Sequence, residues 1–307
     1  MYPPPQILET EVFATVPDAL RYPDRPSWMQ HHHLRAVDCF LEGPGFDRAG
    51  NLYVTELAHG RILRLSPAGA WDVVAEYDGR PNGLRIRPDG AIFVTDRLRG
   101  IVRVHPDGGR IETVLGELPG AKLHGPNDLV IARNGDIYFT DQGETGLNNP
   151  TGRLVRLTAA GAAQVLLDNV PSPNGLALTA DETAVLLAVT RANAIWHVPL
   201  LGSERMPGRV GTFIQMSGGP GGGPDGILLD AEDNLVVAHA RMGAVWVFSR
   251  LGEPLYRLRS CQGPMTTNIA FGGADRRTLF VTESTTGTIL TARLPTPGRD
   301  PGWRAPG

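Results

Sequence analysis

Residues 125–141, GPNDLVIARNGDIYFTD, contain the pattern that decides the fold. The stretch reads as a turn, a strand, a tight reversal and a second strand, and five further copies occur along the chain. Each copy begins at a polar residue, which we call the leader. The six leaders are Glu42, Asn82, Asn127, Asn174, Asp225 and Asn268. Successive leaders lie 40 to 51 residues apart, and a repeat of this length is typical of one four-stranded blade of a propeller.

Two more strand-like runs follow each leader hairpin. In the first copy they are RILRL at residues 61–65 and WDVVAEY at residues 71–77, both rich in residues that favour strands and bounded by turn residues. No segment shows a sustained helical period. We therefore predict an all-β protein, a six-bladed β-propeller with four antiparallel strands per blade, formed by residues 1–307 as a single domain.

The ends of the chain stand outside the repeat. Residues 7–16 are strand-like, and we predict that they complete the last blade beside a strand at residues 288–294, because closing the ring removes a long open edge. Residues 17–37 are expected to form an irregular excursion and residues 295–307 a tail. The run His31-His32-His33 lies in this excursion. Neighbouring histidines in an extended chain point to alternate sides, so we interpret the run as an exposed loop rather than a transition-metal site.

Composition excludes several classes of function. The formal net charge is −3 and there is no dense basic run, so a nucleic-acid partner is not expected. No stretch is apolar over the roughly 20 residues that cross a bilayer, and the first residues lack the features of a secretory signal. We expect a cytoplasmic protein in which Cys39 and Cys261 are free buried thiols, with a disulfide between them as the alternative. The oligomeric state is left open.

Equivalent positions of a propeller form a ring around one axis. The leader ring contains two carboxylates and four amides, which are the oxygen donors of a hard divalent cation, and no Cys or His that would favour zinc. An alternative is that Asn and Asp begin the strands through turn hydrogen bonds, but this does not account for Glu42. We predict one bound divalent cation, with calcium favoured and magnesium, manganese or zinc as alternatives.

Four ordered motifs carry a resemblance to a known family. They are Leu41-Glu42-Gly43-Pro44, Gly125-Pro126-Asn127-Asp128, Pro173-Asn174-Gly175-Leu176 and Gly223-Pro224-Asp225-Gly226. From about residue 12 to residue 294 the chain resembles the SMP-30/gluconolactonase/LRE family of six-bladed propellers with a central divalent cation. The resemblance implies a calcium-type ion held by Glu42, Asn174 and Asp225, with Asn127 as a fourth ligand or a substrate contact. It also implies that Asp225 is the general base or the nucleophile.

The substrate-binding residues are less well marked. Animal members of the family have an arginine two residues before the position of Asn127, where this chain has Gly125. We take Asn82, Arg80, His124 and the loop at residues 142–151 as candidate replacements. The remaining candidates are Asn127, His239 and Asn268, which lie close to the leader ring by repeat position. The glycine-rich passage at residues 207–224 is a second long connection that could shape a pocket.

These observations predict a metal-dependent hydrolase that opens a lactone such as gluconolactone or a related small lactone. In this prediction the cation polarises the carbonyl group, and Asp225 accepts a proton from water or attacks the carbonyl carbon itself. Two alternatives remain at this point: an organophosphate hydrolase that uses the same site, and a binding propeller without catalysis. The sequence specifies neither the lactone nor the metal.

Overall fold

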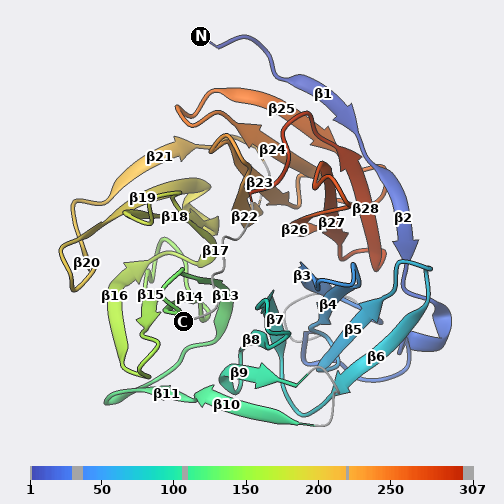
Figure 1. Ribbon diagram of the computed structural model, residues 1–307, viewed down its shortest axis with the longest axis horizontal. Coiled ribbons are helices and arrows are strands. Elements are labelled where there is room, and N and C mark those ends of the chain that lie inside the picture. Colours follow the sequence, from blue (N-terminus) through green and yellow to red (C-terminus); the bar gives the residue numbers. More distant parts are fainter. Residues whose placement is uncertain (1, 30–36, 106–109, 219–220, 300–307) are drawn as a thin grey trace.

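The computed structural model describes residues 2–29, 37–105, 110–218 and 221–299, and the three adjacent histidines lie outside these ranges. Figure 1 shows six small sheets arranged as blades around a common centre. Within each blade the four main strands follow one another outward from the centre in antiparallel order. The predicted all-β, six-bladed propeller is confirmed.

Each blade consists of one leader hairpin and two outer strands. Blade one contains β3 (Leu41–Phe46), β4 (Leu52–Glu56), β5 (Arg61–Leu65) and β6 (Trp71–Glu76). Blade two contains β7 (Pro81–Ile86), β8 (Ile92–Asp96), β9 (Gly100–Val104) and β10 (Ile111–Leu115). Blade three contains β13 (Pro126–Ile131), β14 (Ile137–Asp141), β15 (Gly152–Leu157) and β16 (Ala163–Val170).

The second half of the ring repeats this plan. Blade four contains β17 (Pro173–Leu178), β18 (Ala184–Val189), β19 (Ala194–Leu201) and β21 (Gly211–Gln215), with the short β20 (Met206–Pro207) paired to the far end of β19. Blade five contains β22 (Gly223–Leu229), β23 (Leu235–Ala240), β24 (Ala244–Phe248) and β25 (Pro254–Arg259). Blade six contains β26 (Thr266–Gly272), β27 (Thr278–Glu283) and β28 (Thr288–Arg293).

Few elements lie outside the blades. The hairpin of β11 (Glu117–Leu118) and β12 (Ala121–Lys122) joins blade two to blade three. Helical structure in the described part of the chain is confined to short 3₁₀ segments, which include η1 (Asp18–Leu20) and η3 (Thr190–Ala192). No helix among the described residues is long and apolar enough to span a membrane.

The N-terminal segment closes the ring in two steps rather than one. The single strand predicted at residues 7–16 is divided into β1 (Gln6–Glu9) and β2 (Glu11–Thr15). Strand β2 pairs antiparallel with β28 and completes blade six, as predicted. Strand β1 pairs parallel with β25 and adds a fifth strand to blade five, which the sequence did not predict. The N-terminal segment therefore links the last two blades along their outer edges (Figure 1).

The hydrophobic core lies between neighbouring blades. Leu129 and Phe139 of blade three, for example, pack against Phe93 and Ile101 of blade two, and all four are buried. Alternate residues of each strand face the blade before and the blade after, so both faces of every sheet are covered. This arrangement fixes the inner strands relative to one another, and β3, β7, β13, β17, β22 and β26 contact their neighbours in a closed circle.

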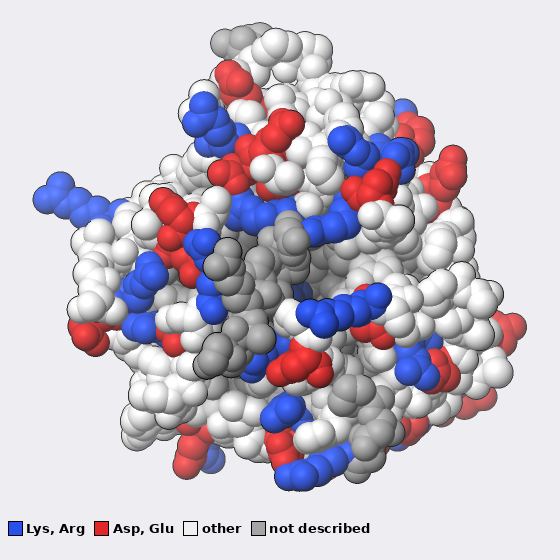
Figure 2. Space-filling view, viewed as in Figure 1, with Lys and Arg blue, Asp and Glu red and all other residues white. Residues whose placement is uncertain are grey.

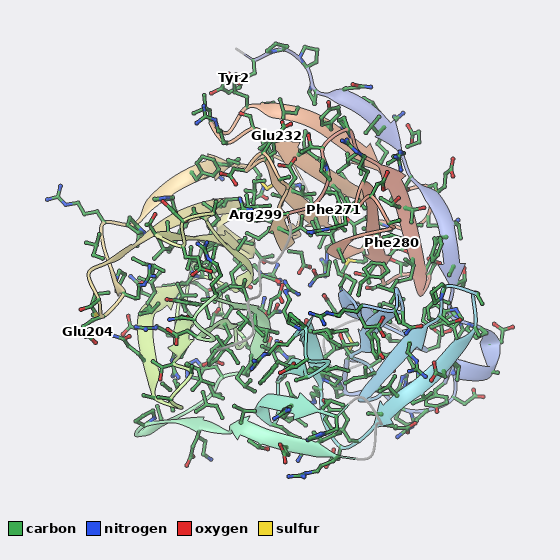
Figure 3. All side chains as sticks on the ribbon, in the orientation of Figure 1. Tyr2, Glu204, Glu232, Phe271, Phe280 and Arg299 are labelled. Atoms are coloured by element: carbon green, nitrogen blue, oxygen red, sulfur yellow. The ribbon has the colours of Figure 1, made fainter. Side chains whose placement is uncertain are left out.

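The described part of the C-terminal tail packs across blades four to six. Gly298 pairs with Asp230 in an isolated bridge, and the guanidinium of Arg299 donates to the carbonyl oxygen of Leu178 at 3.2 Å. Figure 3 shows Arg299 and Phe271 on the central side of the blades. On the face drawn in Figure 2, acidic and basic side chains are intermixed and basic side chains border a central hollow, so that face carries no extended patch of one sign.

The two cysteines are free, which removes the disulfide alternative. Cys39 is buried, as predicted, and burial raises the pKa of its thiol well above the ordinary value. The prediction of a buried Cys261 was wrong, because this residue lies in the connection between β25 and β26 and is exposed. Its position shortly before a leader places it on a loop rather than inside a sheet.

Candidate metal centre and active site

Each leader lies on the innermost strand of its blade, at a β-bulge. The register between the first and second strands shifts beside the leader in all six blades. A bulge places an extra residue on one strand and changes the direction of the side chains beside it. All six leader side chains are buried, with relative exposures of 1 to 8%. Comparison of the six copies in the sequence gave no indication of these bulges.

Threonines from neighbouring blades fix the leader backbone. The hydroxyl of Thr140 in blade three accepts a hydrogen bond from the N–H of Asp128 at 3.0 Å and donates to the carbonyl oxygen of Asn174 in blade four at 2.8 Å. Thr95 does the same one blade earlier, with the N–H of Gly83 and the carbonyl oxygen of Asn127. The backbone positions of Asn127 and Asn174 therefore depend on the blade before them.

The residue after a leader shows a second constraint. Gly83 and Gly175 follow the leaders of blades two and four, and a Cβ atom at either position would lie 2.4 Å or less from atoms of the next blade. In blade three the equivalent residue is Asp128, whose side chain is completely buried. This carboxylate departs from the Asn-Gly and Asp-Gly pattern of its neighbours. Sequence reasoning missed Asp128, although the break in the glycine pattern was a visible signal.

Three carboxylates, those of Glu42, Asp128 and Asp225, interact at the centre. The amide nitrogen of Asn268 donates to Glu42 at 3.2 Å and to Asp128 at 3.4 Å. Burial, together with the charge of Asp128, raises the pKa of Glu42 to about 8. Burial and the charges of the two other carboxylates raise the pKa of Asp225 well above its usual range.

Among the described residues, one positively charged side chain pairs with these three carboxylates. Arg85 lies 3.5 Å from Asp128, but burial outweighs its influence, so the pKa of Asp128 is also raised. Three buried carboxylates with one arginine leave an excess of negative charge. Buried charges are normally paired or coordinate a metal, and a divalent cation would balance this excess.

The amide leaders provide a direct test of whether the residues fit a metal. The side-chain oxygens of Asn82 and Asn174 are buried and have no hydrogen-bond partner, while the side chain of Asn174 also hydrogen-bonds Asp225. Buried polar atoms are almost always partnered. The described residues contain no group of three His, Cys, Asp or Glu side chains arranged to hold a metal, so a site here has to combine carboxylate with amide oxygens. Such a donor set fits calcium or magnesium.

Gln142 orients the leader Asn127. Its side-chain oxygen accepts hydrogen bonds from the amide nitrogen of Asn127 at 3.0 Å and from Arg97 at 3.1 Å. Its own amide nitrogen donates to Ser172 at 3.0 Å. Because the nitrogen of Asn127 is engaged, its oxygen is the atom left for a cation or a substrate. Gln142 begins the loop at residues 142–151, which follows β14 and thus lies at the leader end.

The two candidate histidines differ in their surroundings, and His239 lies opposite Pro224, the residue before the leader Asp225. His124 is exposed and its ring contacts Arg153 of the outer strand β15, whereas its backbone N–H donates to Asp141 at 2.7 Å. His239 is fully buried, and neither ring nitrogen has a partner. Burial lowers the pKa of His239 to about 4, with a further contribution from Arg257. His239 is therefore neutral at physiological pH.

The remaining candidates surround the leader end. Asn268 is held by the carboxylates described above, and Arg80 packs over the ring of Trp28, 4.3 Å from its centre. Beside the loop at residues 142–151 there is an open cavity of about 420 Å³, lined by Glu144, Leu147, Asn149 and Arg191 among others. None of the six leaders lines this cavity. The last part of the passage at residues 207–224 also reaches this end, since Arg191 donates to the carbonyl oxygen of Gly221.

The chain is similar to known lactonases in sequence. It is 29% identical to a gluconolactonase of Zymomonas mobilis over 276 residues, which cover 79% of this chain and 76% of that protein. It is 27% identical to lactonase drp35 of Staphylococcus aureus over 224 residues, which cover 70% of this chain and 68% of that protein.

Solved structures show the same fold. A calcium-binding protein, regucalcin, from Agrobacterium tumefaciens superposes with a TM-score of 0.75 at 22% identity, covering 96% of this chain and 97% of that one. A gluconolactonase from Xanthomonas campestris superposes with a TM-score of 0.73 at 23% identity, covering 96% and 99%. The family model described as the SMP-30/gluconolactonase/LRE-like region matches residues 40–285. The chain therefore belongs to the SMP-30/gluconolactonase/LRE-like family.

Proposed function

We propose that this chain is a lactonase that uses one divalent cation, with calcium as the favoured ion. The observation that carries the proposal is the buried carboxylate and amide set at the centre of the ring, with the unpartnered oxygen of Asn174 beside Asp225. The relatives named gluconolactonase and lactonase support the lactone as substrate.

Glu42, Asn174 and Asp225 would hold the cation, and Asn127 would supply a fourth oxygen. When bound, the cation provides a positive charge that stabilises the negative charge developing on the carbonyl oxygen of the lactone. Gln142 keeps the oxygen of Asn127 free for this role through the bond at 3.0 Å. The threonine bonds between blades hold the leader backbones in place before substrate arrives, which favours a preorganised site.

Asp225 is the residue to which we assign the proton transfer. It is the second carboxylate of the ring, and a neighbouring cation would lower its pKa and keep it ionised. As a general base it takes a proton from the attacking water while the water oxygen bonds to the carbonyl carbon. The ring C–O bond then breaks, and the leaving alkoxide receives a proton. As a nucleophile, Asp225 would instead bond to the carbonyl carbon and expel the ring alkoxide, which gives an acyl-enzyme anhydride that water then hydrolyses.

A lactone panel, assayed with added calcium and again with chelator, tests the proposal. We expect hydrolysis with calcium, loss of most activity with chelator, and a fall in turnover of about a hundredfold or more for Asp225→Asn, the scale of a lost acid–base group. Asp181→Asn, in the exposed reversal of blade four, is the matched control and should retain activity. Near-normal turnover of Asp225→Asn would reject the assignment, and hydrolysis of a phosphotriester without any lactone hydrolysis would reject lactones as the substrate class.

Single-turnover hydrolysis in water enriched in oxygen-18 separates the two roles of Asp225. A general base leaves the label in the product acid alone. A nucleophile places the label in the carboxylate of Asp225 when water attacks the aspartyl carbon of the anhydride, and peptide mass spectrometry would detect it there. Label in Asp225 after one turnover therefore identifies the nucleophile.

A further inference from the structure

Arg97 lies across the backbone of the neighbouring blade. It belongs to the connection between β8 and β9 in blade two, yet a Cβ atom at Gly125 of blade three would lie only 3.4 Å from its guanidinium. Gly125 has a φ of +138°, a conformation that residues other than glycine rarely adopt. Glycine is therefore favoured at residue 125 by its backbone conformation, and the guanidinium of Arg97 lies in van der Waals range of this position, two residues before the leader Asn127.

Arg97 is connected to the leader ring through one side chain. Its guanidinium donates to the oxygen of Gln142 at 3.1 Å, and the same oxygen accepts from Asn127 at 3.0 Å. A second nitrogen of Arg97 pairs with Glu144 at 3.0 Å. Glu144 is 71% exposed, whereas the side chain of Arg97 is 11% exposed. The charge of Arg97 is thus held two hydrogen bonds from the ring, and its carboxylate partner lies out in solvent.

Arg80 adds a second positive charge. Trp28, from the N-terminal excursion, lies within cation–π distance of both arginines, with the guanidinium of Arg80 at 4.3 Å and that of Arg97 at 5.7 Å from its ring centre. The indole N–H donates to the carbonyl oxygen of Leu57 at 3.1 Å, which fixes the ring. Within the described ranges no carboxylate forms an ion pair with Arg80. Among the described residues, the exposed Glu144 is therefore the acid that forms an ion pair with these two arginines.

The balance of charge at this end indicates what is recognised. The ring carboxylate Asp128 pairs with Arg85 and not with Arg80, so the positive charge of Arg80 over Trp28 is available to an anionic group. Two guanidiniums held against one aromatic ring suit a carboxylate, since arginine presents a rigid set of donors to that group. A substrate that places its lactone carbonyl at the ring and a second acidic group at its other end would complete this arrangement.

We propose that Arg97 and Arg80, seated on Trp28, select lactones that carry a free carboxylate, such as the monolactone of a sugar diacid. This inference rests on the proposed lactonase function and specifies its substrate class. In this arrangement Arg97 and Arg80 are specificity-determining residues, and Gln142 is the positioning residue that links Arg97 to the ring.

The test compares kcat/KM for two lactones, glucono-δ-lactone, which is neutral, and glucaro-1,4-lactone, which carries a carboxylate. We expect the wild-type protein to favour the carboxylated lactone. In Arg97→Gln and in Arg80→Gln the ratio of the two kcat/KM values should fall by about 10- to 100-fold, the scale of a lost charge-assisted hydrogen bond. Arg97→Lys keeps the charge without the fork of donors and should recover part of the preference.

Arg64→Gln is the matched control. It removes one arginine charge from the outer strand β5, where Arg64 pairs with Asp72 at the surface, and it should leave the ratio unchanged. A wild-type protein without preference for the carboxylated lactone overturns the inference. An unchanged ratio in Arg97→Gln and Arg80→Gln overturns it as well, because a purely structural arginine would affect both lactones equally.

A binding measurement keeps the inference separate from the proposed function. If neither lactone is hydrolysed, the lactonase proposal fails, and calorimetric titration with glucarate and gluconate in calcium still decides the inference. We expect glucarate, with its second carboxylate, to bind at least tenfold more tightly than gluconate, and this difference to disappear in Arg97→Gln. Equal binding of the two acids by the wild-type protein would overturn the inference.

Discussion

Replacing Glu42 by glutamine should have opposite effects on stability with and without metal. In the metal-free protein Glu42 is a buried acid beside Asp128, with a pKa of about 8 against an ordinary value of 4.5. Each pKa unit corresponds to about 1.4 kcal/mol. At pH 7.5, folding without metal therefore costs on the order of 4 kcal/mol at this residue, because the unfolded chain leaves the carboxylate ionised in water. Glutamine removes this cost and retains an oxygen that can accept the bond from Asn268.

The measurement is chemical unfolding of both proteins in chelator and in excess calcium. In chelator, Glu42→Gln should raise the free energy of unfolding by roughly 2 to 4 kcal/mol, without a change in the slope against denaturant. In calcium the wild-type protein gains the binding free energy, about 4 kcal/mol at a concentration a thousand times the Kd, and the variant gains less. The order of stability should therefore reverse or the difference should vanish.

Glu56→Gln is the matched control for this prediction. Glu56 is equally buried in the same blade, but it is paired with Arg61 at 2.9 Å. Removing one partner of a buried ion pair costs about 3–5 kcal/mol, so this variant should be destabilised in both conditions. If Glu42→Gln is destabilised in chelator as Glu56→Gln is, Glu42 is an ordinary structural acid and the reasoning about a metal ring is refuted.

Three further predictions concern the frame around the site. Thr140→Val should lower the free energy of unfolding by about 2 to 4 kcal/mol, because two buried backbone groups lose their partner. It should also weaken calcium binding in a titration, whereas the exposed control Thr113→Val should change neither quantity. An unchanged calcium affinity in Thr140→Val would reject the role of this bond. The folded-state pKa of His239, about 4, lies below the pKa of histidine in the unfolded chain. The free energy of unfolding should therefore be highest above about pH 6.5 and fall by on the order of 3 kcal/mol as the pH decreases toward 4. His239→Gln should flatten this part of the plot of stability against pH, and an unchanged slope would contradict the assignment. Cys261 is exposed and Cys39 is buried, so a thiol reagent should modify one cysteine rapidly in the folded protein, and rapid modification of two would show that Cys39 is accessible.

The repeat was predictable because each copy of its sequence pattern lies within a single blade. A leader, a hairpin and two outer strands recur at nearly constant spacing, and this period specifies both the number of blades and the residues that face the centre. The closing strand was predictable in part. Strand β2 extends blade six as expected, but the parallel pairing of β1 with β25 depends on where the chain lies before it reaches blade six, which no local sequence pattern indicates.

What the sequence did not predict lies between blades. Thr140 binds Asn174 across a blade boundary, and Arg97 lies against Gly125 of the next blade. These contacts join residues about 30 positions apart, and the sequence around each residue shows no pattern that indicates the contact. Asp128 is the exception that the sequence did show, since four of the other five blades have glycine immediately after the leader and the backbone of the next blade approaches closely there. Its carboxylate could have been noticed as a charge added to the centre.

The most direct test of the account is the position of the ion. Crystals grown in calcium, or in manganese for its anomalous signal, should show one cation with oxygens of Glu42, Asn174 and Asp225 around it, at about 2.3–2.6 Å in the case of calcium. An ion bound elsewhere on the protein, with these three side chains still unliganded at saturating metal, would contradict the central claim that the six blades converge on one metal site.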